Sequence, residues 1–200
     1  AAKSAAAELP EVTEEKLDDA SLALERASAE VEAALADAKR EQFAVEIAEL
    51  SRAAEGLERA AASERIIAKQ SKLAKEAEGL KASIAKELVD EQGDIEAFVV
   101  KTAEGLAVLA PEVSKKLEGL VPQFRSIQKN LKASSEAKGE ESKKKAAAAY
   151  GSADEAAREL AEAAAELRKQ VGETAEELAA ESLEQLEEVT DAREAVDESL

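Results

Sequence analysis

The chain has 200 residues and a formal net charge of −18, and it contains no Cys, His, Met or Trp. Metal, redox and acid–base sites most often depend on these residue types. Hydrophobic residues make up 45 % of the chain, but 47 of them are Ala, and aromatic residues reach only 2 %. This composition argues against a sheet-based core and predicts an all-α protein whose helices approach closely through Ala.

The acidic charge limits the partners that the chain can bind. A net charge of −18 repels the phosphates of nucleic acids and the headgroups of anionic membranes. No apolar run reaches the length of a transmembrane helix, and the first ten residues lack the apolar region of a signal peptide. The absence of an initial Met indicates processing or trimming. The sequence predicts a soluble protein without a nucleic-acid partner or a transmembrane segment.

The first 90 residues carry an apolar stripe at alternating three- and four-residue steps, which is typical of an amphipathic helix. Pro10 suits the first turn of such a helix. The stripe shifts register at residues 39–42 and 62–65, although neither joint contains Pro or Gly. Ser63 is able to cap a helix, so we predict a turn or kink there. Whether residues 9–91 form one bent helix, two or three stays open.

The middle of the chain contains stronger signals for helix starts and stops. Gly93 and Asp94 suit a helix stop followed by a helix start. Pro111 suits the first turn of a further helix. Pro122 lies inside a stretch that otherwise reads as helical, and it predicts either a kink or a break there.

The best predicted loop covers residues 134–151, which include two adjacent Ser residues, Gly139 and a run of three Lys. Ser152 and Glu155 then form a capping-box pattern. The helix predicted after them has the most regular stripe of the chain. Its inner positions recur about every 3.6 residues and place Leu167 and Leu178 on one face, 11 residues apart.

Charge is distributed unevenly along the chain. Residues 152–200 carry 16 acids and 4 bases, whereas residues 112–150 carry 5 acids and 9 bases. The basic segment therefore precedes the acidic helix across the predicted loop. We predict that the two segments pack as an antiparallel pair with complementary faces. The alternative is that the basic segment recruits an acidic partner.

The densest carboxylate cluster lies on the last predicted helix. Di-iron bundles combine Glu with His at helical spacing, and without His or Cys the affinity for transition metals is poor. We therefore interpret the cluster as a solvated face and predict no metal site. Its members are Glu173, Glu176, Glu177, Glu181, Glu184 and Glu188.

Other candidate groups favour structural interpretations. The basic run Lys143, Lys144 and Lys145 is able to touch phosphate, but it fits a solvated loop better. Tyr150, the only Tyr, is predicted to pack at a helix start. The chain has no nucleophile elbow, phosphate-binding Gly loop or dinucleotide fingerprint. We predict no catalytic residue, no cofactor and no small-molecule ligand, and hence no enzyme.

One short motif recurs. Glu-Gly-Leu occurs at residues 55–57, 78–80, 104–106 and 118–120. Its spacing is irregular, so it does not indicate a solenoid. A Gly inside a helix costs about 1 kcal/mol relative to Ala, and it permits close crossing or local bending.

In style, the whole chain resembles a computationally designed helical bundle. The resemblance rests on the round length, the absence of an initial Met, the four missing residue types, the Ala/Glu/Leu/Lys helices and the capping signals at Gly93–Asp94 and Ser152–Glu155. It implies an engineered scaffold. A weaker resemblance, based on 11-residue periodicity, Pro111 and Pro122, is to exchangeable apolipoproteins, and it implies helices that open onto lipid.

These patterns predict an all-α, elongated antiparallel helical bundle of four or five amphipathic helices. The predicted helices are 9–61, 63–91, 94–109, 111–133 and 153–199, with a loop at 134–151. The predicted core is Leu24, Val31, Leu35, Ile47, Leu50, Leu57, Ile84, Leu88, Phe98, Leu106, Leu117, Leu160, Leu167, Leu178, Leu186 and Val189.

The predicted function is structural, that of a scaffold. Two alternatives belong to other classes. The first is a reversible binder of lipid or other apolar surfaces. The second is a module that binds a helix in a groove beside a kinked 94–131 segment. Long Ala-rich stripes also allow homo-oligomers.

Overall fold

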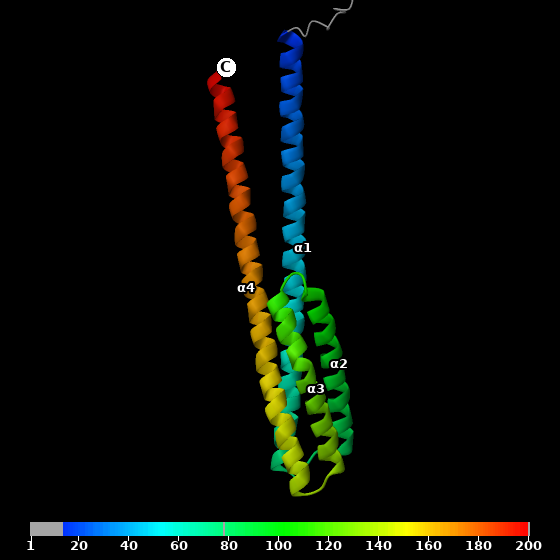
Figure 1. The fold of residues 1–200 in the computed structure, drawn as a ribbon. Coiled ribbons are helices and arrows are strands. Elements are labelled where there is room, and N and C mark those ends of the chain that lie inside the picture. Colours follow the sequence, from blue (N-terminus) through cyan, green and yellow to red (C-terminus); the bar gives the residue numbers. More distant parts are fainter. Residues whose placement is uncertain (1–13, 78, 200) are drawn as a thin grey trace, which may run out of the picture. The chain divides into compact units, whose positions relative to one another are not determined.

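A computed structural model describes the backbone of residues 14–77 and 79–199, and the side chains of residues 21–77 and 79–190. These residues form four α-helices and no strand: α1 (Glu14–Glu76), α2 (Ala82–Leu106), α3 (Pro111–Glu136) and α4 (Glu140–Ser199) (Figure 1). The predicted all-α bundle is thereby confirmed. The chain divides into two compact units, Ala1–Ala44 and Val45–Leu200. The predicted helix start at residues 9–13 lies outside the described residues.

The second unit is an antiparallel four-helix bundle. α2 packs on α3, and α3 packs on α4. The part of α1 that follows residue 45 contacts α2 through Glu64 and Gln92. It contacts α4 through Glu58, which accepts two hydrogen bonds from Arg168 at 2.6 and 2.9 Å. Short connections between successive helices reverse the chain each time, and the order α1–α2–α3–α4 closes around one core.

The core of this bundle is made of large side chains from α1, α2 and α3 and of many Ala from α4. Ala lets α4 approach closely, because it places only one methyl group at the interface. The buried apolar residues of α4 are Ala146, Ala149, Ala153, Ala156, Ala157, Leu160, Ala163, Ala164 and Leu167. The largest fully buried side chain is Phe124 of α3. Ala-rich packing against Leu and Ile therefore compensates for the scarcity of aromatic residues.

The turn predicted at Ser63, and with it the helix boundary at residues 61–63, is wrong, because α1 runs through it without interruption. Ala and Glu residues around Ser63 are good helix formers, and Ala60, Ala61 and Ile67 are buried on a continuous face. The chain reverses later, at Gly79. This residue has φ +106°, and its N–H donates to the carbonyl of Ala74 at 3.1 Å.

The predicted stop at Gly93–Asp94 is also wrong, because both residues lie inside α2. Buried residues continue across Gly93 at helical spacing, from Leu88 through Gln92 and Ile95 to Val99. Burial of this face outweighs the cost of one interior Gly, which is about 1 kcal/mol. The separate helices predicted at 63–91 and 94–109 therefore correspond to the end of α1 and to α2.

The start at Pro111 is confirmed, and Pro122 does not break α3. Pro122 lacks an N–H and leaves the carbonyl of Glu118 without its helical donor. Both residues are exposed, so water can hydrogen-bond to that carbonyl. The helix continues to Glu136, three residues beyond its predicted end.

The predicted loop at 134–151 is mostly helical. α3 ends at Glu136 and α4 begins at Glu140, so the connection is only residues 137–139, with Gly139 at φ +58°. Glu140 and Glu141 suit the positive end of the new helix, and the Lys and Ala that follow are strong helix formers. Ser152, the predicted cap, therefore lies inside α4.

Two buried Ser residues tie the ends of α3 and α4 together. Ser134 Oγ donates to the carbonyl of Ser142 at 3.0 Å, and Ser142 Oγ donates to the carbonyl of Ser134. Of the predicted pairing between the basic and acidic segments, α3 packs on α4 as expected, whereas residues 140–150 of the basic segment belong to α4 itself. An ion pair from basic α3 runs to α2 instead, from Arg125 to Glu96 at 2.9 Å.

The predicted core is correct only within the bundle. Seven of its residues are buried: Leu50, Leu57, Leu88, Leu106, Leu117, Leu160 and Leu167. Four are half-buried: Ile47, Ile84, Phe98 and Leu178. Five are exposed: Leu24, Val31, Leu35, Leu186 and Val189. The first three of these belong to the first unit, and the last two follow Thr174, the last buried residue of α4 among the described side chains.

Replacing Gly119 by Ala is expected to stabilise the bundle by about 0.5–1 kcal/mol, because Gly119 is exposed inside α3 and nothing lies within 4 Å of an added Cβ. Gly79→Ala is the opposite control. A side chain is strained at φ +106°, and the new Cβ would overlap Ser142 Oγ. Urea unfolding measures both changes. A destabilising Gly119→Ala would show that α3 is not the continuous helix described.

Candidate functional site

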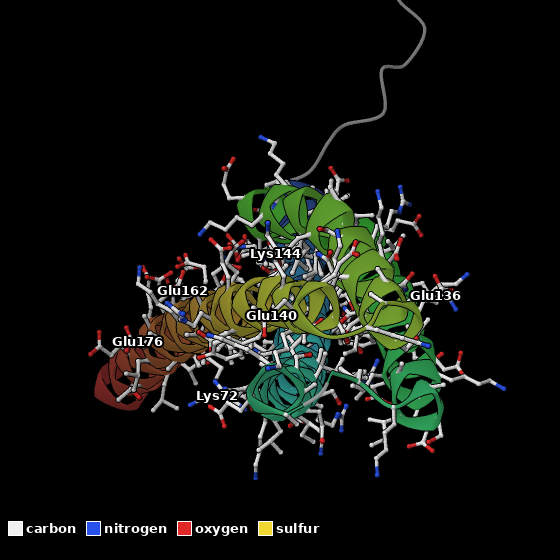
Figure 2. The ribbon with its side chains drawn as sticks, turned by 90° about the horizontal axis from the view of Figure 1, so that it is seen from below. Lys72, Glu136, Glu140, Lys144, Glu162 and Glu176 are labelled. Atoms are coloured by element: carbon white, nitrogen blue, oxygen red, sulfur yellow. The ribbon has the colours of Figure 1, made fainter. Side chains whose placement is uncertain are left out.

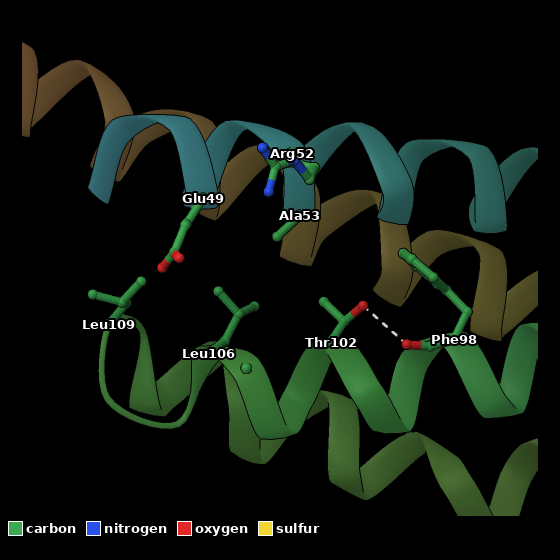
Figure 3. Close-up of a pocket in the computed structure, with 8 residues that line it drawn as sticks. Glu49, Arg52, Ala53, Phe98, Thr102, Leu106 and Leu109 are labelled. Atoms are coloured by element: carbon green, nitrogen blue, oxygen red, sulfur yellow. Dashed lines mark hydrogen bonds between the residues drawn. The ribbon is translucent and has the colours of Figure 1, made fainter. Parts of the chain in front are cut away.

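One recess of the bundle lies between α1 and α2, near the connection to α3. Side chains of α1, of α2 and of the turn after α2 line this recess (Figure 3). The residues drawn are Glu49, Arg52 and Ala53 from α1, Phe98, Thr102 and Leu106 from α2, and Leu109 from the turn. The volume of the recess is about 280 Å³. The hydroxyl of Thr102 donates to the carbonyl of Phe98 at 2.9 Å, so its proton is already engaged within the helix.

The chemistry available in this recess is limited. Glu49 and Arg52 are exposed, and the rest of the lining is mostly apolar. The volume is slightly below the usual range for pockets that bury a small molecule. The lining also lacks a nucleophile with an adjacent base. The recess is therefore a gap in helix packing that suits an apolar side chain better than a reacting substrate.

A buried polar pair lies elsewhere, between α1 and α2. Gln92 Nε2 donates to Glu64 Oε1, and both residues are fully buried. The other carboxylate oxygen of Glu64 and the amide oxygen of Gln92 have no hydrogen-bond partner. Burial raises the pKa of Glu64 to about 7, while the hydrogen bond from Gln92 lowers it and the charge of Glu91 raises it further.

The two unpartnered oxygens indicate which protonation state fits this geometry. A protonated Glu64 can donate its O–H to the amide oxygen of Gln92 while it still accepts from the amide nitrogen. An ionised Glu64 leaves two buried acceptors without donors, which costs free energy. Below a pH of about 7, the pair is a neutral acid–amide contact that links α1 to α2.

Sequence reasoning missed this pair, although a signal was present. Glu64 falls on the same helical face as Leu57, Ala61 and Ala68, which are all buried. A carboxylate at an apolar position of an amphipathic helix marks a buried polar group. Ser71, one turn beyond Ala68, is also buried, and its Oγ has no hydrogen-bond partner.

The groups singled out by the sequence do not converge on one site. Among the described residues, no group of three or more acidic side chains is placed to hold a metal ion. Glu173 pairs with Lys169 at 3.3 Å, and Lys143 pairs with Glu140 at 3.2 Å in the first turn of α4. Tyr150 is half-buried against the core inside α4, not at a helix start.

The recurring Glu-Gly-Leu motif occupies unrelated environments. Gly56 is buried, and a Cβ there would overlap the ring of Phe98. Gly79 forms the turn after α1, Gly105 lies near the end of α2, and Gly119 is exposed inside α3. The motif therefore does not mark a repeated structural unit.

Comparison with protein-family models, curated proteins and solved structures finds no match for this chain. Within the described residues, none of the helices combines the length and the apolar character needed to cross a bilayer.

Proposed function

We propose that the protein is a structural scaffold: a packed four-helix bundle that holds a long helix so that its far end is available for contact. One observation carries this proposal. α4 is a single helix of 60 residues whose apolar positions are buried as far as Thr174, while Leu183, Leu186 and Val189 beyond it are exposed. One rigid element thus joins the core to an apolar surface.

A designed origin is part of the proposal and is supported by the Ala/Glu/Leu/Lys composition. The interior positions of Gly93, Gly119, Gly151 and Gly172 depart from idealised helix design, which keeps Gly out of helix interiors. The buried side chains explain why these positions are tolerated, because each helix is held by its apolar face and not by propensity alone.

The alternative function is reversible binding to lipid or other apolar surfaces. It is favoured by exposed apolar residues on the first unit, including Leu24, Val31 and Leu35. The groove anticipated beside residues 94–131 is a weaker candidate, because α2 and α3 bury their apolar faces in the bundle core. What remains there is the recess beside Phe98.

A thermal melt followed by far-UV circular dichroism, with and without vesicles, tests the scaffold proposal. We expect high helicity and a cooperative transition that neither zwitterionic nor anionic vesicles shift, because the core residues are already buried in the bundle. Low helicity that rises with vesicles, combined with a broad transition, would reject the scaffold and favour lipid binding.

A further inference from the structure

The last third of α4 carries an apolar surface that the bundle does not cover. Leu183, Leu186 and Val189 are 62 %, 65 % and 67 % exposed. They lie three residues apart on one side of the helix, and the half-buried Leu178 lies 11 residues before Val189, on the same face as Val189 and nearer to the bundle. We call Leu183, Leu186 and Val189 the distal stripe. Residues 175–190, which contain it, span about 24 Å of helix, enough to contact four turns of a partner helix.

The surroundings of the distal stripe are uniformly acidic. Residues 175–190 contain six Glu and no Lys or Arg. Glu176 and Glu187 are 11 residues apart, about three helical turns, so they lie along the same edge of the stripe. Figure 2 shows Glu176 pointing outwards from α4 (Figure 2). A partner that covers the stripe therefore meets a row of carboxylates.

This arrangement is unfavourable for an uncovered helix. Glu184 and Glu188 are one turn apart, and like charges at this spacing destabilise a helix. Three large apolar side chains are exposed as well. A partner that supplies both positive charge and apolar surface would relieve both costs.

We propose that the distal stripe binds a basic amphipathic helix, one with an apolar face flanked by Lys or Arg. Charge complementarity selects this partner among helices and excludes a symmetric pairing of two distal stripes, which would bring carboxylates together. The basic α3 segment of a second copy fits poorly, because its apolar residues, such as Phe124 and Ile127, are fully buried. Anionic lipid is repelled by the same carboxylates.

This proposal rests on the scaffold function, and the two can fail separately. If the thermal melt shows no cooperative bundle, the scaffold fails. If the bundle melts cooperatively and the partner does not bind, only the present proposal fails.

The test uses the full chain and a fluorescein-labelled amphipathic peptide of about 20 residues, with Leu and Lys at heptad spacing. Fluorescence anisotropy measures its affinity. We expect saturable binding that weakens as salt rises. The double variant Leu183→Ser/Leu186→Ser should weaken binding by about tenfold or more, because it removes the centre of the apolar contact.

Two matched controls separate the stripe from general effects. Val108→Ser removes an apolar side chain that is 89 % exposed but lies far along the chain, in the turn after α2. It should leave the affinity unchanged. Glu176→Gln/Glu187→Gln should weaken binding severalfold, whereas Glu159→Gln/Glu162→Gln removes the same charge from the bundle part of α4 and should have little effect.

Three results would overturn the proposal. The first is that the peptide does not bind. The second is that it binds equally well to the Ser double variant, which would indicate unspecific attraction between opposite charges. The third is that sedimentation shows a dimer of the chain that the Ser double variant abolishes, so that a second copy occupies the stripe. Each variant is checked by its melting transition, which should not change because the substituted side chains are exposed.

Discussion

Replacing Leu167 by Asp is expected to lower the free energy of unfolding by about 4–5 kcal/mol, a large part of the stability of a small bundle. Leu167 is fully buried in α4. The substitution removes a packed side chain and places a carboxylate where no partner is available. Leu167→Ala, which only leaves a cavity, should cost about 3 kcal/mol and keeps the prediction measurable if the Asp variant does not fold.

The matched control is Leu186→Asp on the same helix. Leu186 is exposed, so this variant should lie within about 0.5 kcal/mol of the unsubstituted chain. Urea unfolding followed by circular dichroism measures all three variants. If Leu167→Asp and Leu186→Asp had the same effect, the boundary that the structure places at Thr174 would be wrong.

The side chains of α4 show why the sequence predicted this helix but not the environment of its apolar face. The last predicted helix places Leu167, Leu178 and Val189 on one face at 11-residue steps. Periodicity reports which face of a helix is apolar, and it contains no information about how far a partner extends along that face. The three residues are therefore equivalent in the sequence, but they are buried, half-buried and exposed in the structure.

The errors in helix ends have a related cause. Gly93 and Ser152 are good local stop and start signals, and each is worth about 1 kcal/mol. Burial of a single Leu or Ile is worth about 1.5–3 kcal/mol, so a continuous apolar face overrides such a signal. Gly79 and Gly139 do form turns because both have positive φ, which only the backbone reveals.

The candidate sites were predictable in part. The acidic face of α4 and its apolar stripe are visible in the sequence, and the absence of His and Cys restricts the chemistry. The pairing of Glu64 with Gln92 requires the register between α1 and α2, because these residues are 28 positions apart in the chain. No local pattern specifies that register.

Replacing Glu64 by Gln is expected to stabilise the bundle at alkaline pH and to leave it nearly unchanged at acidic pH. The pKa of Glu64 is raised from 4.5 to about 7 in the folded chain, chiefly by burial. Between these values the folded chain binds more protons than the unfolded chain, so the free energy of unfolding falls as pH rises. The stability that protonated Glu64 contributes is fully present below pH 4.5 and is lost as pH rises through about 7. Its size is about 3 kcal/mol.

A Gln at position 64 keeps the two-bond contact with Gln92 without an ionisable group. The difference in the free energy of unfolding between Glu64→Gln and the unsubstituted chain should therefore grow from near zero at pH 4 to its full value at pH 8. Glu58→Gln provides a control of opposite sign. The hydrogen bond from Arg168 lowers the pKa of Glu58, so that carboxylate favours folding once it is ionised, and Glu58→Gln loses this benefit as pH rises.

Urea unfolding at several pH values measures the free energy of unfolding of Glu64→Gln, of Glu58→Gln and of the unsubstituted chain. Taking each variant relative to the unsubstituted chain removes the pH dependence of the other carboxylates. A difference between Glu64→Gln and the unsubstituted chain that does not change with pH would mean that Glu64 ionises as readily in the folded chain as in the unfolded one. The acid–amide contact would then not be buried as the geometry indicates.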